Sequence, residues 1–242
     1  MARIKKIYQQ DELNCMDKQF RDKHPKDILK WCVDVEGDKF IQVSAFSIED
    51  LIITDILYND FHAGDRLGTP VLFINTLHHF KDTLDTVTAN YKKYGLALKV
   101  YRPKHCKKRV DFNEKYGDKL WERDLERYHQ VTKIEPLYRG MDEVITYSWL
   151  TGRRRSQSES RKDMQIFEWT SKERLKINPL AYWTKEQVWE EAKKRDILYN
   201  PMYDRGYMSI GDAPLTTPVE DGEDERDGRW RGSKVSECGM HE

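Results

Sequence analysis

Two kinds of hydrophobic pattern alternate along the first part of the chain. Short apolar runs at 40–46, 71–74 and 96–101 are typical of buried strands. Residues 48–57 and 81–94 carry apolar side chains at the spacing of amphipathic helices. This alternation favours right-handed crossovers and a mostly parallel sheet with helices on both faces. A ligand is then expected beyond the carboxyl ends of the strands.

The second part of the chain continues the alternation. Residues 144–150 form another apolar run, and 166–169 and 174–177 are typical of two strands paired around a turn. Thr184 is expected to cap a helix over 185–194, because a glutamine follows it three residues later, as in a capping box.

The chain is expected to form one α/β domain with an arm. Residues 1–200 hold the periodic segments and begin with a charged, partly helical lead-in. Residues 201–242 are rich in Gly, Pro and charged side chains and show little periodicity. We therefore predict an α/β domain over 1–200 and an extended arm over 201–242 that returns to the site.

The charge of the chain argues against nucleic acid as a partner. Its 42 basic and 42 acidic residues balance, so no overall field attracts a polyanion. A local basic island is formed by Arg153, Arg154, Arg155, Arg161 and Lys162. An island in a neutral chain favours a small polyanionic ligand.

The cysteines and the apolar runs restrict the class further. The four cysteines, Cys15, Cys32, Cys106 and Cys238, include no CxxC pair, which argues against a zinc ribbon or a dithiol motif. No cluster of His, Cys, Asp and Glu has the spacing of metal ligands, so no metal is expected. No apolar run approaches ~20 residues and no signal core begins the chain. We therefore expect a cytoplasmic protein that is not bound to a membrane.

The turn between the first predicted strand and helix is a candidate anion site. Ser44, Ala45, Phe46 and Ser47 occupy it. A helix amino terminus presents N–H groups and a favourable dipole to an anion, and serine hydroxyls add donors. An ordinary serine cap is the alternative. No GxxxxGK[ST] sequence is present, so the turn is not a Walker loop.

Two arginine-rich segments are further candidates. The segment 152–161 follows a predicted core strand, and its glycine and arginines suit close contact with phosphate or sulfate oxygens. In 222–230, Arg226 and Arg229 are three residues apart and can point at one anion. The alternatives are a solvated basic loop for the first segment and a surface network of ion pairs for the second.

The end of the chain carries a candidate nucleophile. Cys238 lies between small and polar residues, and His241 follows it closely. A thiol in this setting acts as a nucleophile when nearby positive charge favours its thiolate. An incidental cysteine in a terminal segment is the alternative.

Taken in order, these segments resemble the phosphoadenylyl-sulfate (PAPS) reductases, the thioredoxin-dependent enzymes of assimilatory sulfate reduction. The resemblance covers residues 44–241 and is carried by GRRRSQ at 152–157 with Arg161, YMSIGD at 207–212, GEDERDGRW at 222–230 and ECGMH at 237–241. Residues 74–80 and 133–137 match as well.

The resemblance implies a fold, a set of roles and a reaction. The fold is adenine nucleotide α-hydrolase-like, with 44–47 as a modified PP-loop. The implied substrate-binding residues are Ser44, Ala45, Phe46 and Ser47 in that loop, Thr76, Leu77 and Gly152 near the adenosine, Arg153, Arg154, Arg155 and Gln157 in the basic loop, and Lys133, Arg161, Arg226 and Arg229 at the phosphosulfate. Cys238 would attack the sulfuryl sulfur, with His241 beside it, and the resulting S-sulfonate would yield sulfite to reduced thioredoxin or glutaredoxin. No cofactor would be bound, and a homodimer is plausible.

The resemblance also bears on the substrate. Iron–sulfur relatives that reduce adenylyl sulfate (APS) carry a Cys-Cys pair and a later CxxC. The matching positions here hold Tyr128, His129, Asp212 and Leu215, which do not form a set of cluster ligands. We therefore expect no iron–sulfur cluster and favour PAPS over APS, with Arg153, Arg154 and Arg155 as unranked candidates for its 3'-phosphate.

Three other functions stay open at this point. The first is a cluster-free APS reductase. The second is an ATP-dependent PP-loop ligase or thiolation enzyme, against which the absence of an SGGxDS sequence argues. The third is a non-catalytic nucleotide sensor in which the terminal cysteine is incidental.

Overall fold

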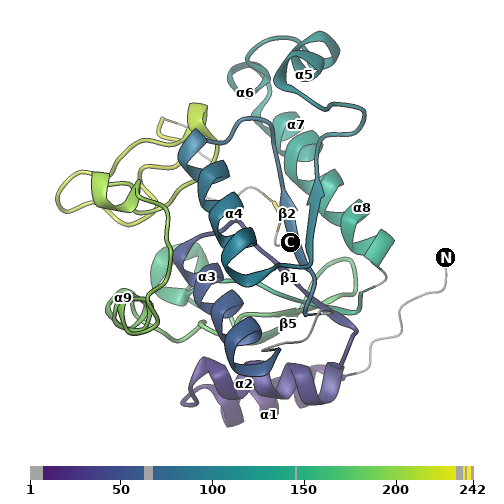
Figure 1. The fold of residues 1–242 in the computed structure, drawn as a ribbon, viewed down its shortest axis with the longest axis vertical. Helices are drawn as coiled ribbons and strands as arrows, with labels where there is room; N and C mark the ends of the chain where they lie inside the picture. Colours follow the sequence, from purple (N-terminus) through teal and green to yellow (C-terminus); the bar gives the residue numbers. More distant parts are fainter. Residues whose placement is uncertain (1–7, 63–67, 145, 233–236, 238, 241–242) are drawn as a thin grey trace.

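A six-stranded sheet forms the centre of the molecule, in the order β3-β2-β1-β4-β6-β5 (Figure 1). The strands are β1 (Phe40–Val43), β2 (Val71–Ile74), β3 (Leu98–Tyr101), β4 (Ser148–Leu150), β5 (Phe167–Trp169) and β6 (Leu175–Ile177). All neighbouring strands pair in parallel except β5 and β6, which are antiparallel. The computed structural model describes residues 8–62, 68–144, 146–232, 237 and 239–240.

Helices surround this sheet. The α-helices are α1 (Gln10–Phe20), α2 (Pro25–Trp31), α3 (Ile48–Asp55), α4 (Lys81–Tyr94), α5 (Arg109–Tyr116), α6 (Leu120–Arg123), α7 (Leu125–His129), α8 (Glu135–Val144) and α9 (Lys185–Lys194). Three π-helical segments, η1 (Cys32–Glu36), η2 (Ile56–Phe61) and η3 (Gln130–Ile134), extend α2, α3 and α7. Short 3-10 turns are η4 (Arg155–Gln157), η5 (Glu159–Arg161), η6 (Tyr203–Arg205) and η7 (Ala213–Leu215).

The core lies on both faces of the sheet, because successive strand residues point to opposite sides. In β1, Phe40 packs into the cluster that includes residues of α2, α3, α4 and α9. Ile41 and Val43 face the other way and pack with Leu137 and Met141 of α8. The four residues of β1 are all buried, which explains its continuous apolar pattern.

Most of the predicted elements are confirmed. The bounds of β2, α4 and α9 match the prediction, and Thr184 caps α9 by accepting a hydrogen bond from the Gln187 N–H. The lead-in, expected to be partly helical, contains α2 and also α1, for which no helix was predicted, because only Leu13 and Asp17 are buried along α1. The strand expected from residue 144 begins at Ser148, since α8 extends to Val144.

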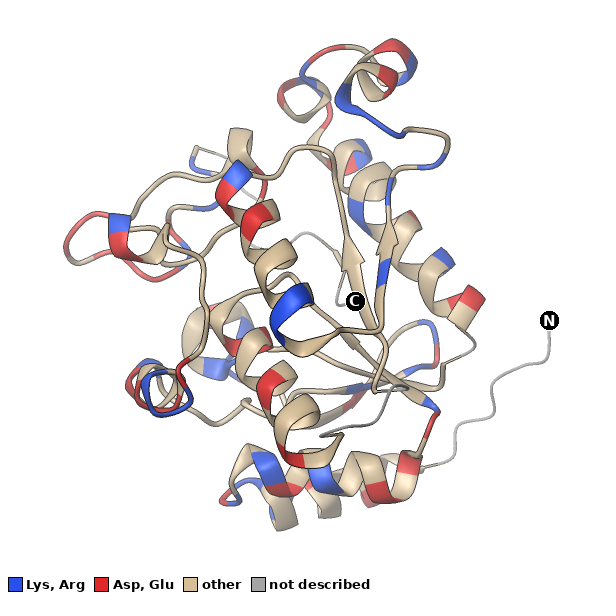
Figure 2. Ribbon diagram, viewed as in Figure 1, with Lys and Arg blue, Asp and Glu red and all other residues tan. Residues whose placement is uncertain are grey.

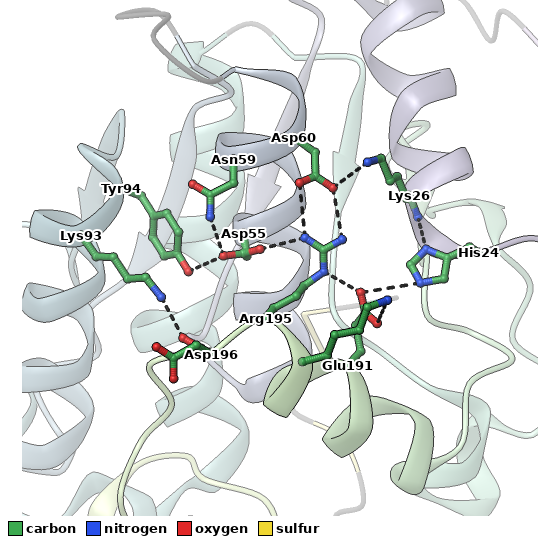
Figure 3. A network of polar contacts seen from close by, with 11 residues as sticks. His24, Lys26, Asp55, Asn59, Asp60, Lys93, Tyr94, Glu191, Arg195 and Asp196 are labelled. Carbon is green, nitrogen blue, oxygen red and sulfur yellow. Dashed lines mark hydrogen bonds and ion pairs between the residues drawn. The ribbon is translucent and has the colours of Figure 1, made fainter.

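A network of charged side chains holds α9 against α3 (Figure 3). The Arg195 guanidinium, at the end of α9, donates to Asp55 at 2.9 Å, to Asp60 at 3.1 Å and to Glu191 at 2.5 Å. Asp55 also accepts from the Tyr94 hydroxyl at 2.8 Å. The network therefore joins α3, η2, α4 and α9.

The outer surface carries both signs of charge. Basic and acidic residues are interspersed along α1, α4 and α9 (Figure 2). Among the described residues, no helix has both the length and the apolar character needed to cross a membrane.

Candidate functional site

A cavity of about 180 Å³ lies at the carboxyl ends of β1, β2 and β4. Ser44, Thr76 and Gly152, which follow these three strands, line it. This is the edge of the sheet at which the sequence predicts a ligand.

The loop at 44–47 is closed by a carboxylate from its own helix. Ser47 caps α3 and accepts a hydrogen bond from the Asp50 N–H at 3.3 Å. The Asp50 carboxylate accepts in return from the N–H groups of Ala45, at 2.8 Å, and Ser47, at 3.4 Å. These N–H groups were expected from the sequence to bind an anion. In the structure, the Asp50 carboxylate already accepts hydrogen bonds from them. Phe46 does not line the cavity, because its ring is buried against Phe73.

Asp50 also fixes the loop after β4. Its second carboxylate oxygen accepts from the Gly152 N–H at 2.9 Å. A Cβ atom at position 152 would lie 2.6 Å from the Asp50 nitrogen, so only glycine fits this approach. Burial raises the pKa of Asp50 to about 6, although the N–H groups of Gly152 and Ala45 lower it.

The three consecutive arginines have different surroundings. Arg153 lines the cavity. Arg154 does not line it: its side chain is 1% exposed and pairs with Glu49 at 3.0 Å. Arg155 does not line it either, because its guanidinium lies over the Tyr182 ring, 4.9 Å from the centroid. The structure therefore brings only the first of the three to the cavity.

Two further predicted residues in this region reach the cavity. Gln157 and Arg161 line it, and the Arg161 guanidinium donates to the Gln157 side-chain oxygen. The Gln157 amide in turn donates to Glu49 at 3.0 Å.

A buried aspartate contacts the residues that line the cavity next to the end of β2. Asp212 is 0% exposed, accepts from the Thr76 hydroxyl at 2.5 Å and pairs with the Lys133 ammonium at 2.7 Å. Although burial alone would raise it, the charge of Lys133 holds the pKa of Asp212 well below its usual range. Thr76 and Lys133 line the cavity as predicted from the resemblance, whereas Leu77 packs with the cluster around Phe112.

Residues from the segment 201–242 also line the cavity. Arg226, Arg229 and Trp230 line it. The Trp230 ring lies below both guanidinium groups, with 4.4 Å from its centroid to Arg229 and 5.4 Å to Arg226. Its indole N–H donates to the His129 Nε2 atom at 3.1 Å. Burial lowers the pKa of His129 to about 3, so this imidazole is neutral at physiological pH and can accept the bond.

One carboxylate lies on the arginines of this cavity. Glu237 accepts from Arg161 at 2.6 and 3.0 Å, in a bidentate arrangement, and from Arg226 at 3.1 Å. Although burial would raise it, the pKa of Glu237 is lowered by the hydrogen bond from Arg161 and the charge of Arg226. A carboxylate carries the geometry and charge that these arginines would present to a phosphate or sulfate group.

Two predicted residues cannot be placed. Cys238 and His241 lie outside the described residues. Among the described residues, no group of three or more His, Cys, Asp or Glu side chains could hold a metal ion. Tyr128 and Leu215, at positions matched to cluster ligands in iron–sulfur relatives, pack in one apolar cluster.

Several residues of the cavity were not predicted from the sequence. Glu49, Asp50, His79 and Glu237 line it without having been proposed as site residues, and His129 supports it from behind. Asp50 had a signal, because Ser47 and an acid three residues later form a capping box. Glu237 had none beyond its place next to Cys238.

The sheet and the cavity together define an α/β protein with a cationic site at the carboxyl edge of its strands. A family model described as the phosphoadenosine phosphosulfate reductase domain matches residues 39–218. The chain belongs to this family, and it is an oxidoreductase of this kind.

Relatives of both substrate classes resemble the chain. A protein from Emericella nidulans named phosphoadenosine phosphosulfate reductase is 38% identical, over 97% of this chain and 76% of the relative. A Bacillus pumilus protein named adenosine 5'-phosphosulfate reductase is 33% identical, over 89% of each chain. A crystal structure of PAPS reductase from Candida auris, as a phosphate complex, has a TM-score of 0.78 and 32% identity, over 87% of this chain and 98% of that chain. The predicted fold is thereby confirmed.

Proposed function

We propose that the chain reduces PAPS to sulfite and adenosine 3',5'-bisphosphate through an S-sulfonate on Cys238. The observation that carries the proposal is the Glu237 carboxylate on Arg161 and Arg226. Glu237 and Met240, on either side of Cys238 in the sequence, both line the cationic cavity. A nucleophile at position 238 is thus next to residues that reach the anion site.

The proposed reaction has two steps. The Cys238 thiolate attacks the sulfuryl sulfur, the bond from sulfur to the phosphate oxygen breaks, and the bisphosphate leaves as an anion. A thiolate of reduced thioredoxin or glutaredoxin then attacks the Cys238 sulfur and releases sulfite, and its second thiol resolves the mixed disulfide. The redoxin supplies both electrons, so no resident cofactor or iron–sulfur cluster takes part.

The cavity supports the first step by electrostatics. Lys133, Arg161, Arg226 and Arg229 would surround the phosphosulfate and offset the repulsion between an anionic substrate and a thiolate. The same positive charge favours the thiolate form of a nearby cysteine. His241, close to Cys238 in sequence, is proposed to assist there.

The proposal extends to the organisation of the protein. Residues 1–200 would form the catalytic domain and 201–242 the arm that delivers the cysteine. The enzyme would work in the cytoplasm, where redoxins are kept reduced, and would require no nucleic acid or membrane. A homodimer is part of the proposal, since the resemblance made it plausible.

The mass of the intact protein tests this mechanism. After incubation of the reduced protein with PAPS and no redoxin, the mass should rise by one SO₃ group and return on addition of reduced thioredoxin. Cys238→Ser should show no increase, whereas Cys15→Ser, which removes an exposed thiol of α1, should behave like the wild type. An unmodified wild type at saturating PAPS would refute the proposal.

APS is the second candidate substrate, because relatives of both names resemble the chain. Of the three consecutive arginines, only Arg153 lines the cavity, so we assign a 3'-phosphate contact to it. Sulfite formation from the two nucleotides should favour PAPS. In Arg153→Ala the preference should fall by about 10-fold or more, the usual effect of losing a charged hydrogen bond. Equal rates with both nucleotides in the wild type would instead make APS a substrate.

A further inference from the structure

Arg154 is a deeply buried arginine next to the site, at 1% exposure. Its three nitrogens donate to three partners: Nε to Glu49 at 3.0 Å, Nη1 to Ser156 at 2.7 Å and Nη2 to Glu225 at 2.6 Å. Each nitrogen of the guanidinium donates to a side chain of the protein, and Arg154 does not line the cavity. These contacts indicate a structural role for Arg154, in which it connects separate segments of the chain.

The two acids on Arg154 belong to separate parts of the site. Glu49 lies in the first turn of α3, directly before the aspartate that closes the 44–47 loop. Glu225 lies in the arm, directly before Arg226. The pair Arg154–Glu225 therefore connects the arm to the sheet beside one of the arginines of the cavity.

The arm has a second anchor five residues later. The Trp230 indole donates to the buried His129, and the Trp230 N–H donates to the Leu215 carbonyl at 3.0 Å. Gly228 permits the approach, because a Cβ atom there would lie 2.2 Å from the Thr217 carbonyl oxygen. The segment 225–230 is thus held at both ends, and Arg226 and Arg229, between the two anchors, line the cavity.

We propose that Arg154 is a positioning residue, and that through Glu225 it holds Arg226 at the anion site. This assignment replaces the role of substrate ligand that the sequence suggested for Arg154. It rests on the proposed function only in naming the anion as part of a sulfonucleotide. The contacts that connect Arg154 to Glu49 and Glu225 are observed in the structure and do not depend on the proposed function.

The test removes Glu225 and keeps Arg154. Loss of Arg154 would leave Glu49 and Glu225 facing each other without a cation, and such a protein can fail to fold. Glu225→Ala avoids this, and Glu225→Gln retains an oxygen that accepts from Arg154. Glu223→Ala is the matched control, because Glu223 lies outside 225–230 and pairs with the exposed Arg231.

The first readout needs no ligand. Hydrogen exchange of the peptide that covers 224–230 reports the hydrogen bonds from Asp227 to Asp224, from Arg229 to Arg226 and from Trp230 to Leu215. Glu225→Ala should accelerate this exchange by about 10-fold or more, as expected from the loss of one charged hydrogen bond. Glu225→Gln should recover part of the protection, and Glu223→Ala should stay near the wild type. Unchanged exchange in Glu225→Ala would overturn the proposal.

The second readout is the affinity for adenosine 3',5'-bisphosphate, measured by calorimetry. In an otherwise wild-type protein, Glu225→Ala should weaken binding by about 10-fold. In an Arg226→Ala background the same change should weaken binding by less than about 2-fold, because Glu225 acts through Arg226. An equal loss in both backgrounds would overturn the positioning role. If the wild type does not bind the bisphosphate, the proposed function fails, and the exchange measurement alone decides the inference.

Discussion

Two groups of paired charges in this molecule are built differently. Around Arg195, the partners Asp55, Asp60 and Glu191 belong to α3, η2 and α9, which pack against the core (Figure 3). Acids outnumber the arginine, and Lys26 adds a second cation at 3.0 Å from Asp60. All the acidic partners in this network belong to helical segments, and the network connects these segments to one another.

At the cavity, two arginines share one carboxylate. Lys133 pairs with Asp212, and Arg161 and Arg226 share the carboxylate of Glu237. Glu237 belongs to the last residues of the chain rather than to a helix or a strand. A ligand anion that binds Arg161 and Arg226 would compete with Glu237, whereas the acids around Arg195 do not line the cavity. This difference distinguishes a structural ion-pair network from a ligand-binding site.

Arg195→Met should break the structural group. It would leave three carboxylates near one another without their shared cation, and the loss of charged hydrogen bonds from a partly buried guanidinium costs about 2 kcal/mol. Urea denaturation should show this loss in the free energy of unfolding. The folded fraction should bind adenosine 3',5'-bisphosphate like the wild type, since the network does not line the cavity.

Lys30→Ala is the control for this change. Lys30 pairs with Asp34 at 2.7 Å on the exposed surface, and such pairs contribute about 0–1 kcal/mol. A loss in Arg195→Met no larger than in Lys30→Ala would mean that the Arg195 network does not stabilise the fold.

The fold could be predicted from the sequence because its central strands are buried on both faces. β2 is a run of four buried residues, and α4 carries its apolar side chains at helical spacing. The helix α1 escaped the pattern, since it touches the core mainly through Leu13 and through Asp17, whose carboxylate accepts from the Ile166 N–H. A polar residue that faces inward cannot be told from an exposed one by hydrophobic pattern alone.

The cavity was predictable in position and in sign of charge, but not residue by residue. Three consecutive arginines look equivalent in a sequence, yet tertiary contacts direct Arg153 to the cavity, Arg154 to Glu49 and Arg155 to Tyr182. These partners are far away in the chain, so local spacing carries no signal for them.

Asp50→Asn sharpens the comparison within one helix, because Asp50 and Asp55 are both buried in α3. Asp55 faces the Arg195 cation, whereas Asp50 is held by backbone N–H groups. Burial raises the pKa of Asp50 to about 6, so the folded state binds more protons than the unfolded state between the ordinary value, 3.8, and 6. The contribution of Asp50 to stability is therefore present at low pH and is lost as the pH rises through 6.

The measurement is the free energy of unfolding of both proteins at pH 4, 5, 6 and 7. The advantage of Asp50→Asn over the wild type should grow by about 2 kcal/mol between pH 4 and pH 6, and then level off. The buried His129, with a pKa of about 3, acts in the opposite direction, but it is present in both proteins and cancels in the difference. A difference that is constant across this range would contradict the assignment.

Glu237→Gln tests whether the partner of the site arginines is replaceable. At pH 7 Glu237 is ionised, because Arg161 and Arg226 outweigh the effect of burial and lower its pKa. A bound anion must therefore displace a carboxylate that makes charged hydrogen bonds to the same two arginines. Glutamine keeps the shape and weakens this competition, so the affinity for inorganic phosphate should rise by about 10-fold.

Titration calorimetry with phosphate distinguishes competition from support. Glu220→Gln, an exposed change in the arm, should leave the affinity unaltered. If Glu237 instead oriented Arg161 and Arg226 for the anion, its replacement would weaken phosphate binding, and the two groups of charges would then be built alike. Tighter binding in Glu237→Gln alone means that the carboxylate occupies the anion site until a substrate displaces it. The acids around Arg195, which belong to helical segments, do not compete with a ligand in this way.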